Sequence, residues 1–134
     1  IEHSLFWRDN HSGLMLKARP DSYHHPVIID LKTISDASPR NYQSEMVKHG
    51  YHIQGAMCQD ALEILTGYRI QTVINIVIEN KYPYAMGIYK IDEFALEEGQ
   101  RKYKQICLDL KNARLENKWQ DYGVQTISLP KWAL

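Results

Sequence analysis

Cysteine, net charge and long apolar runs are what this sequence of 134 residues has least of. Its two cysteines, Cys58 and Cys107, are too few for the disulfide framework of a small secreted domain, so we expect buried free thiols in a reducing cytoplasm. No apolar run approaches the roughly 18–20 residues that cross a bilayer, and no signal peptide is visible, so no membrane association is expected. Sixteen basic residues balance sixteen acidic ones, which excludes a polycation that binds by bulk charge but leaves room for a local basic groove.

The length and an ordinary globular composition indicate a single domain, residues 1–134. We expect it to be a fragment of a longer chain, because it begins at Ile1 without a methionine. Turn signals and hydrophobic periodicity predict the order β-β-β-α-α-β-β-α, with strands over residues 5–7, 14–19, 27–33, 69–79 and 84–91 and helices over 39–49, 51–66 and a long segment after 92. This order predicts an α/β fold in which a mixed central β-sheet is flanked by helices.

The helix boundaries carry the clearest local signals. Ser38-Pro39 is typical of a helix start, with Ser38 as the N-cap. Gly50 and Gly67 are expected to end the first two helices, and Asp92 to cap the third. Residues 23–26 are predicted to form a loop.

Three packing expectations follow from the apolar pattern. The Val and Ile run of residues 27–33 favours a strand that is covered on both faces. Trp119 and Trp132, in an irregular tail, are available to cover the core. The apolar stripe of the last helix is predicted to consist of Tyr103, Ile106, Cys107, Leu110 and Ala113.

Asp30 and Lys32 lie in the third predicted strand, where the alternation of side chains puts both on one face. Asp21 follows the end of the neighbouring strand and is close enough to join them. Two carboxylates and an ammonium group on one sheet edge suit a hard cation that prefers oxygen ligands. The alternative is a solvated ion pair on an edge strand, because a lone Asp-x-Lys is common.

Such a group suits phosphodiester hydrolysis. A divalent cation held by Asp21 and Asp30 would polarise a phosphoryl oxygen and lower the pKa of bound water, while Lys32 would orient that water or stabilise charge in the transition state. The backbone carbonyl of Leu31 is a candidate neutral ligand. Glu2 is a candidate acidic ligand, with an exposed, frayed terminus as the alternative. A mixture of aromatic and basic side chains that suits a nucleic-acid backbone lies nearby, at Tyr42, Lys48, His49, Tyr51 and His52.

Pro20-Asp21 followed, after eight residues, by Asp30-Leu31-Lys32 resembles the PD-(D/E)xK signature of a superfamily of metal-dependent nucleases with a restriction-endonuclease-like core. More narrowly, residues 13–21 and 28–33 resemble the nuclease domain of the exodeoxyribonuclease VIII (RecE-type) family. Residues 36–39 and 50–54 extend this match, which covers about residues 1–90.

The resemblance implies a role for each matching residue. Asp21 and Asp30 correspond to metal-binding aspartates, and Lys32 to the catalytic lysine. Gln54 corresponds to a glutamine that helps to place the scissile strand near the metal, with an ordinary surface glutamine as the alternative. Related nucleases often have a tyrosine four residues after that glutamine, where this chain has Cys58, and some use a histidine from a helix that would precede this sequence.

The activity implied is that of a Mg²⁺-dependent exonuclease, with Mn²⁺ as a substitute, which degrades one strand of duplex DNA from an end in the 5′-to-3′ direction. The family acts in phage-type recombination, which implies a bacterial or phage-encoded protein, a single-strand-annealing protein as partner, and a homo-oligomer. The alternatives are an endonuclease or processing nuclease of the same superfamily, and a non-catalytic nucleic-acid-binding or assembly domain that keeps the fold.

Overall fold

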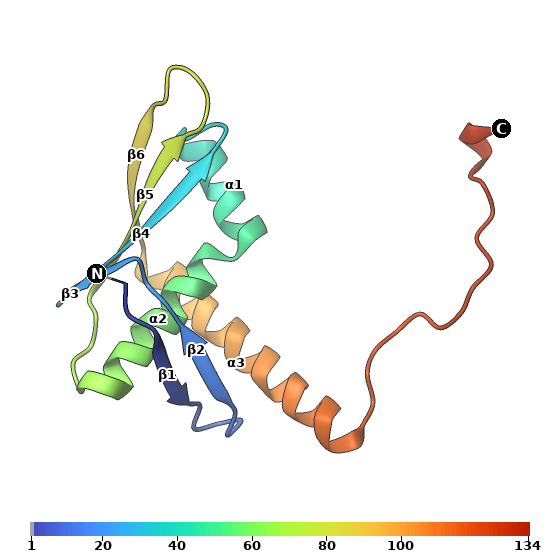
Figure 1. The fold of residues 1–134 in the computed structure, drawn as a ribbon, viewed down its shortest axis with the longest axis horizontal. Helices are drawn as coiled ribbons and strands as arrows, with labels where there is room; N and C mark the ends of the chain where they lie inside the picture. Colours follow the sequence, from blue (N-terminus) through green and yellow to red (C-terminus); the bar gives the residue numbers. More distant parts are fainter. Residues whose placement is uncertain (1) are drawn as a thin grey trace.

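The computed structural model describes residues 2–134, and Figure 1 shows strands and helices in a mixed α/β arrangement. The strands are β1 (Leu5–Arg8), β2 (Met15–Ala18), β3 (Ser22–His24), β4 (Val27–Ile34), β5 (Thr72–Glu79) and β6 (Met86–Ile91). The helices are α1 (Pro39–His49), α2 (Tyr51–Thr66) and α3 (Glu93–Glu116), followed by one 3-10 turn, Lys131–Ala133. The predicted α/β class is therefore confirmed.

The strands form two separate sheets. β1 and β2 make an antiparallel hairpin, as expected, and this hairpin stands apart from a sheet with the order β3-β4-β5-β6. In the larger sheet the central pair, β4 and β5, is parallel, and the two outer pairs are antiparallel. The expected mixed sheet is thus present, and its parallel crossover runs through α1 and α2.

Strand boundaries differ from the predicted ones where pairing decides them. Residues 22–24 form β3 instead of a loop, because they pair with the start of β4. β5 begins at Thr72 rather than residue 69, because its partner strand begins at Val27, which lies opposite Thr72. β6 begins at Met86 rather than residue 84, because Tyr84 has a φ of 60° and belongs to the preceding turn.

The helix ends follow the local signals. Gly50 and Gly67 adopt left-handed conformations (φ of 69° and 77°) that end α1 and α2. Asp92 caps α3 by accepting a hydrogen bond from the backbone N–H of Ala95 at 2.7 Å. Ser38 precedes α1 as predicted, but its side chain makes no capping hydrogen bond.

Only one face of the larger sheet is covered. Ile28, Val73 and Val77 point toward the helices and are almost completely buried. Leu31 and Ile88 lie on the other face and are 55% and 62% exposed. The prediction that the third strand is covered on both faces is therefore wrong for the described part of the chain, because α1 and α2 pack on the same side.

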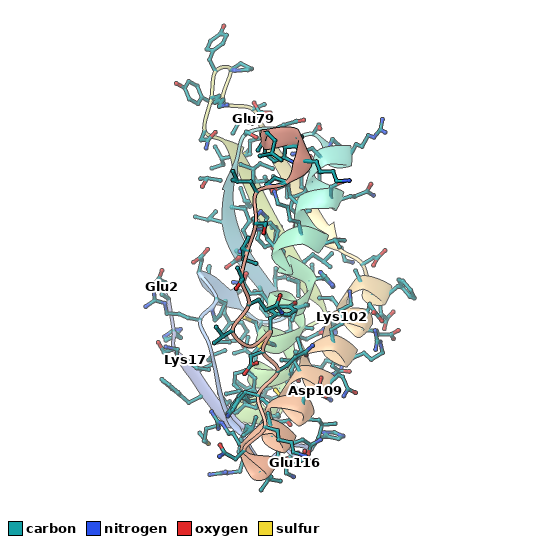
Figure 2. All side chains as sticks on the ribbon, turned by 90° about the vertical axis from the view of Figure 1, so that its right-hand side faces the viewer. Glu2, Lys17, Glu79, Lys102, Asp109 and Glu116 are labelled. Atoms are coloured by element: carbon teal, nitrogen blue, oxygen red, sulfur yellow. The ribbon has the colours of Figure 1, made fainter. Side chains whose placement is uncertain are left out.

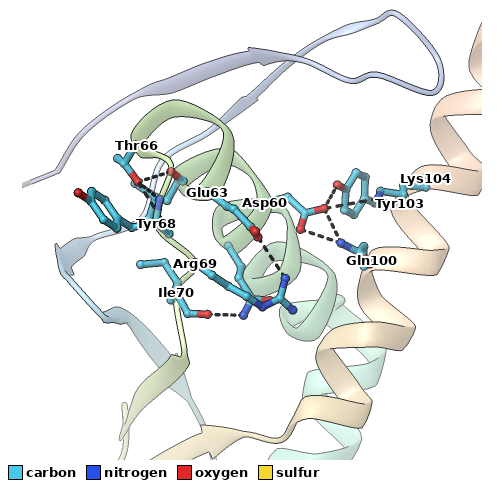
Figure 3. A network of polar contacts seen from close by, with 11 residues as sticks. Asp60, Glu63, Thr66, Tyr68, Arg69, Ile70, Gln100, Tyr103 and Lys104 are labelled. Atoms are coloured by element: carbon cyan, nitrogen blue, oxygen red, sulfur yellow. Dashed lines mark hydrogen bonds and ion pairs between the residues drawn. The ribbon is translucent and has the colours of Figure 1, made fainter.

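Helix α3 is held against α2 by close packing and by a buried carboxylate. Asp60 of α2 accepts two hydrogen bonds from the Gln100 side-chain amide, at 2.7 and 2.8 Å, and one from the hydroxyl of Tyr103 (Figure 3). Gly99 lies against the backbone of α2 at His52. These contacts fix the first half of α3 along α2, from His52 in its first turn to Asp60 in its second half.

The second half of α3 and the tail extend away from the sheet (Figure 1). Tyr103 and Cys107 of the predicted stripe are buried, whereas Ile106 is 58% exposed because no element packs against its side of the helix. Trp119 and Trp132 are 57% and 88% exposed, so the expectation that they cover the core is wrong. Across residues 2–134, no helix is both long and apolar enough to cross a membrane.

Candidate active site

The candidate site lies at the edge of β4, beyond the end of β3. Pairing between these strands ends at Ile29, which lies opposite Ser22, so the next residues of β4 have a free edge on that side. Asp21 occupies this edge, and its Oδ2 accepts a hydrogen bond from the backbone N–H of Leu31 at 2.7 Å. The short length of β3 is therefore what brings Asp21 beside the middle of β4.

Asp30 and Lys32 project to one face, as the alternation of side chains predicts. Lys32 Nζ forms an ion pair with Asp30 Oδ2, and both side chains are largely buried. They lie on the face that α2 covers, so the pair is not the solvated one that the sequence left open.

Gln54 of α2 joins the two charged groups. Its Oε1 accepts a hydrogen bond from Lys32 Nζ at 2.7 Å, and its Nε2 donates to Asp30 Oδ1 at 3.4 Å. The structure thus brings together Asp21, Asp30, Lys32 and Gln54, from the β2–β3 connection, β4 and α2. Their roles in catalysis stay predictions.

A row of aromatic rings borders this cluster. Lys32 Nζ lies 4.5 Å from the centroid of the Tyr51 ring. Tyr51 stacks between His49 and Tyr42, at centroid distances of 5.5 and 6.3 Å, and Tyr42 stacks on Tyr89 at 4.6 Å. Tyr51 and His49 were predicted near the site.

Asn75 is a site neighbour that was not among the residues predicted from the sequence. It lies opposite Asp30 on β5, is 2% exposed, and donates a hydrogen bond to the Tyr42 hydroxyl at 2.6 Å. A buried amide of this kind needs a partner, which Tyr42 supplies. The signal was present, because Asn75 is the one polar residue in the apolar run 73–78.

Burial and neighbouring charges shift the pKa values of several groups here. Burial raises the pKa of Asp30; the Asp21 carboxylate adds to this effect, and the Lys32 ammonium opposes it. Burial also raises the pKa of Tyr42 to about 12 and that of the Cys58 thiol to about 12. Cys58 therefore stays a neutral thiol at physiological pH and is no nucleophile.

The oxygen atoms at the β4 edge fit a small hard cation. Within residues 2–134, no three His, Cys, Asp or Glu side chains come together, but Mg²⁺ commonly takes only one or two carboxylates and keeps several waters. Asp21 and Asp30 supply two carboxylates. Because the N–H and C=O of a strand residue point to the same side, the carbonyl of Leu31 faces the edge that holds Asp21. Glu2 does not join this group and instead contacts Arg19, with Oε2 3.5 Å from Nε.

Cys58 lines the same small pocket as Asp30 and Gln54, which agrees with its predicted place on the Gln54 face of the helix. It is 2% exposed, so it cannot replace the DNA contact of a tyrosine. The aromatic group beside Lys32 comes instead from Tyr51. An upstream histidine ligand falls outside the sequence.

Comparison with known proteins gives two findings. A family model described as "PDDEXK-like domain of unknown function (DUF3799)" matches residues 1–126. A crystal structure of a protein from Eubacterium rectale, named "putative exonuclease", superimposes with a TM-score of 0.70 at 17% sequence identity. The match covers 88% of this chain but 46% of the other, so this chain spans about half the length of that protein. The comparison with curated proteins finds no match.

Proposed function

This chain belongs to the family of PDDEXK-like domains (DUF3799), and on that premise we propose that it is a metal-dependent nuclease that hydrolyses phosphodiester bonds in DNA. The observation that carries the proposal is the cluster of Asp21, Asp30, Lys32 and Gln54 on one edge of the sheet. Two carboxylates, a buried ammonium and an amide that holds it are the groups that phosphodiester hydrolysis needs.

Asp21, Asp30 and the carbonyl of Leu31 would hold the cation. A divalent cation supplies, when bound, polarisation of a phosphoryl oxygen and a lowered pKa for water. Mg²⁺ or Mn²⁺ suits these ligands, because all of them are oxygens. Asp21 is itself fixed by the N–H of Leu31, so both carboxylates are positioned by the backbone of β4.

Lys32 acts as a positive charge near the phosphate rather than as a base. A carboxylate, an amide oxygen and the face of an aromatic ring surround its Nζ and hold it in place. An ammonium held in this way stabilises the charge that develops on the phosphoryl oxygens. Gln54 positions it, because its amide contacts both Lys32 and Asp30.

We further propose that hydrolysis starts at DNA ends. This part is supported by the RecE-type resemblance of residues 13–21 and 28–33, whereas the cluster alone gives no preference for ends. The 5′-to-3′ direction, assembly into a homo-oligomer and cooperation with a single-strand-annealing protein belong to the same proposal. An endonuclease of the superfamily is the second candidate, since the same cluster serves both.

The test compares linear duplex DNA with covalently closed circular duplex of the same sequence, in Mg²⁺. We expect progressive loss of the linear form, an intact circle, and no reaction in the presence of a chelator. Nicking of the circle at a comparable rate would identify an endonuclease, and full activity with the chelator would exclude the metal mechanism.

Matched variants show whether the cluster does the chemistry. Asp30→Asn and Lys32→Ala should each abolish hydrolysis, because each removes a charge from the site, while circular dichroism confirms that they fold. Lys90→Ala, an exposed lysine on β6, should keep the wild-type rate. Hydrolysis at the wild-type rate by either site variant would contradict the role given to that residue.

A further inference from the structure

A groove of about 390 Å³ lies between β2 and the turn that joins α1 to α2. Its walls include Lys17 and Arg19 from the hairpin side and His49 from the end of α1, and its apolar floor includes Ile53 and Met57. Gln54 also lines the groove. Figure 2 shows Lys17 on the outer edge of the hairpin, on the side of the molecule away from α3.

Gln54 connects this groove to the candidate active site. It lines the groove and also the small pocket that contains Asp30, and its amide holds Lys32 Nζ at 2.7 Å. Arg19 is joined to Asp21 through Pro20 alone, so the hairpin wall of the groove leads directly into the first carboxylate. Gln54 therefore lies between the groove and the cluster, and the hairpin wall of the groove is joined to Asp21 along the chain.

The basic groups of the groove are accessible and lightly paired. The Arg19 side chain is 60% exposed, and within residues 2–134 its one ion pair is with Glu2, at 3.5 Å, an exposed pair of the kind that contributes little energy. His49 pairs with Glu45 at 2.9 Å and stacks on Tyr51. Lys17 makes no ion pair within the described residues. Phosphate groups can replace Glu2 without breaking any buried contact.

We infer that this groove holds the sugar–phosphate backbone of the DNA strand that is cleaved, an inference that rests on the proposed function. Lys17 and Arg19 contact phosphates next to the scissile one, the apolar floor of Ile53 and Met57 contacts the sugars, and Gln54 lies where the strand enters the site. The chain has no net charge, so its affinity for DNA comes from such a local groove rather than from a large overall field.

The experiment measures the affinity of a fluorescent linear duplex in Ca²⁺ at several salt concentrations, after a gel has shown that the DNA stays intact. The test variant is Lys17→Ala with Arg19→Ala. The matched control is Arg101→Ala with Lys102→Ala, which removes the same two charges from the exposed side of α3; Arg101, like Arg19, pairs with a glutamate. Figure 2 shows Lys102 on the side away from Lys17.

We expect the test variant to bind more weakly. The slope of log affinity against log salt concentration should fall in magnitude by about 1.8, because each of the two lost phosphate contacts removes about 0.9. The control should keep the wild-type slope. If the wild-type protein cleaves DNA, an unchanged slope in the test variant, or an equal change of slope in the control, would overturn the inference that this groove binds DNA. A wild-type protein that neither binds nor cleaves DNA would overturn both the proposed function and the inference about the groove.

Discussion

At the scale of single residues, the position of the Lys32 ammonium is set by a side chain from another element. Gln54 accepts a hydrogen bond from Lys32 and donates one to Asp30, so Asp30 and Lys32 form part of a three-residue network and not an isolated salt bridge on β4. An amide has both donors and an acceptor, which neither a carboxylate nor an ammonium offers. This makes Gln54 a positioning residue for the proposed reaction.

Gln54→Ala should lower kcat for linear duplex DNA by about 10–100-fold, the range typical for residues that position groups at a metal site. The unfolding temperature should change little, because Lys32 keeps its partner Asp30. Gln43→Ala on the exposed side of α1 is the control and should keep both values. A wild-type kcat in the Gln54 variant would show that it is an ordinary surface glutamine.

At the scale of elements, the site depends on how closely α3 approaches α2. A Cβ atom at Gly99 would lie 2.8 Å from the carbonyl carbon of His52 and 3.1 Å from Cα of Ile53. Both are backbone atoms of the first turn of α2, the turn that leads into Gln54. The absence of a side chain at Gly99 therefore allows α3 to support the turn that carries the positioning amide.

Gly99→Ala should lower the free energy of unfolding by about 1–3 kcal/mol through overpacking. The better helix propensity of alanine offsets at most about 1 kcal/mol of this loss. Urea denaturation measures the change. Gln105→Ala, at an exposed position of the same helix, should stay within about 0.5 kcal/mol of wild type. Equal stability of the Gly99 variant and this control would mean that the helices separate at little cost.

At the scale of the whole molecule, the body ends with α3 and the tail adds no buried side chain. All residues from 117 to 134 are exposed, and Val124, Ile127 and Leu134 are among them. Figure 1 shows the tail leaving the end of α3 and running apart from the sheet. The core is formed by β1, the larger sheet, α1, α2 and α3 as far as Cys107.

Deletion of residues 119–134 should leave the unfolding temperature within about 2 °C of the full chain, because the removed segment buries nothing in this structure. Differential scanning fluorimetry measures it. Deletion of residues 103–134 is the control; it also removes Tyr103 and Cys107 from the core and should lower the unfolding temperature strongly. A large loss from the shorter deletion would show that the tail packs on the body in solution.

Features that depend on neighbouring residues could be predicted from the sequence alone. Gly50, Gly67 and Asp92 end or begin helices at the predicted residues, because the left-handed turn and the N-cap are local backbone effects. The common face of Asp30 and Lys32 follows from the period of a strand. Gln54 was found through a resemblance of motifs, since local spacing gives no reason for its contact with Lys32.

The remaining features depend on contacts between segments that are far apart in the chain. In the tertiary structure one face of the sheet is open at Leu31, and Ile106 and both tail tryptophans are exposed. The buried Asn75 is paired with Tyr42. In the tertiary structure β3 also begins only at Ser22, which leaves Asp21 free to reach the N–H of Leu31. Apolar side chains in a sequence are candidates for burial, but which of them are covered depends on where helices far along the chain come to pack, because hydrophobic burial is non-directional.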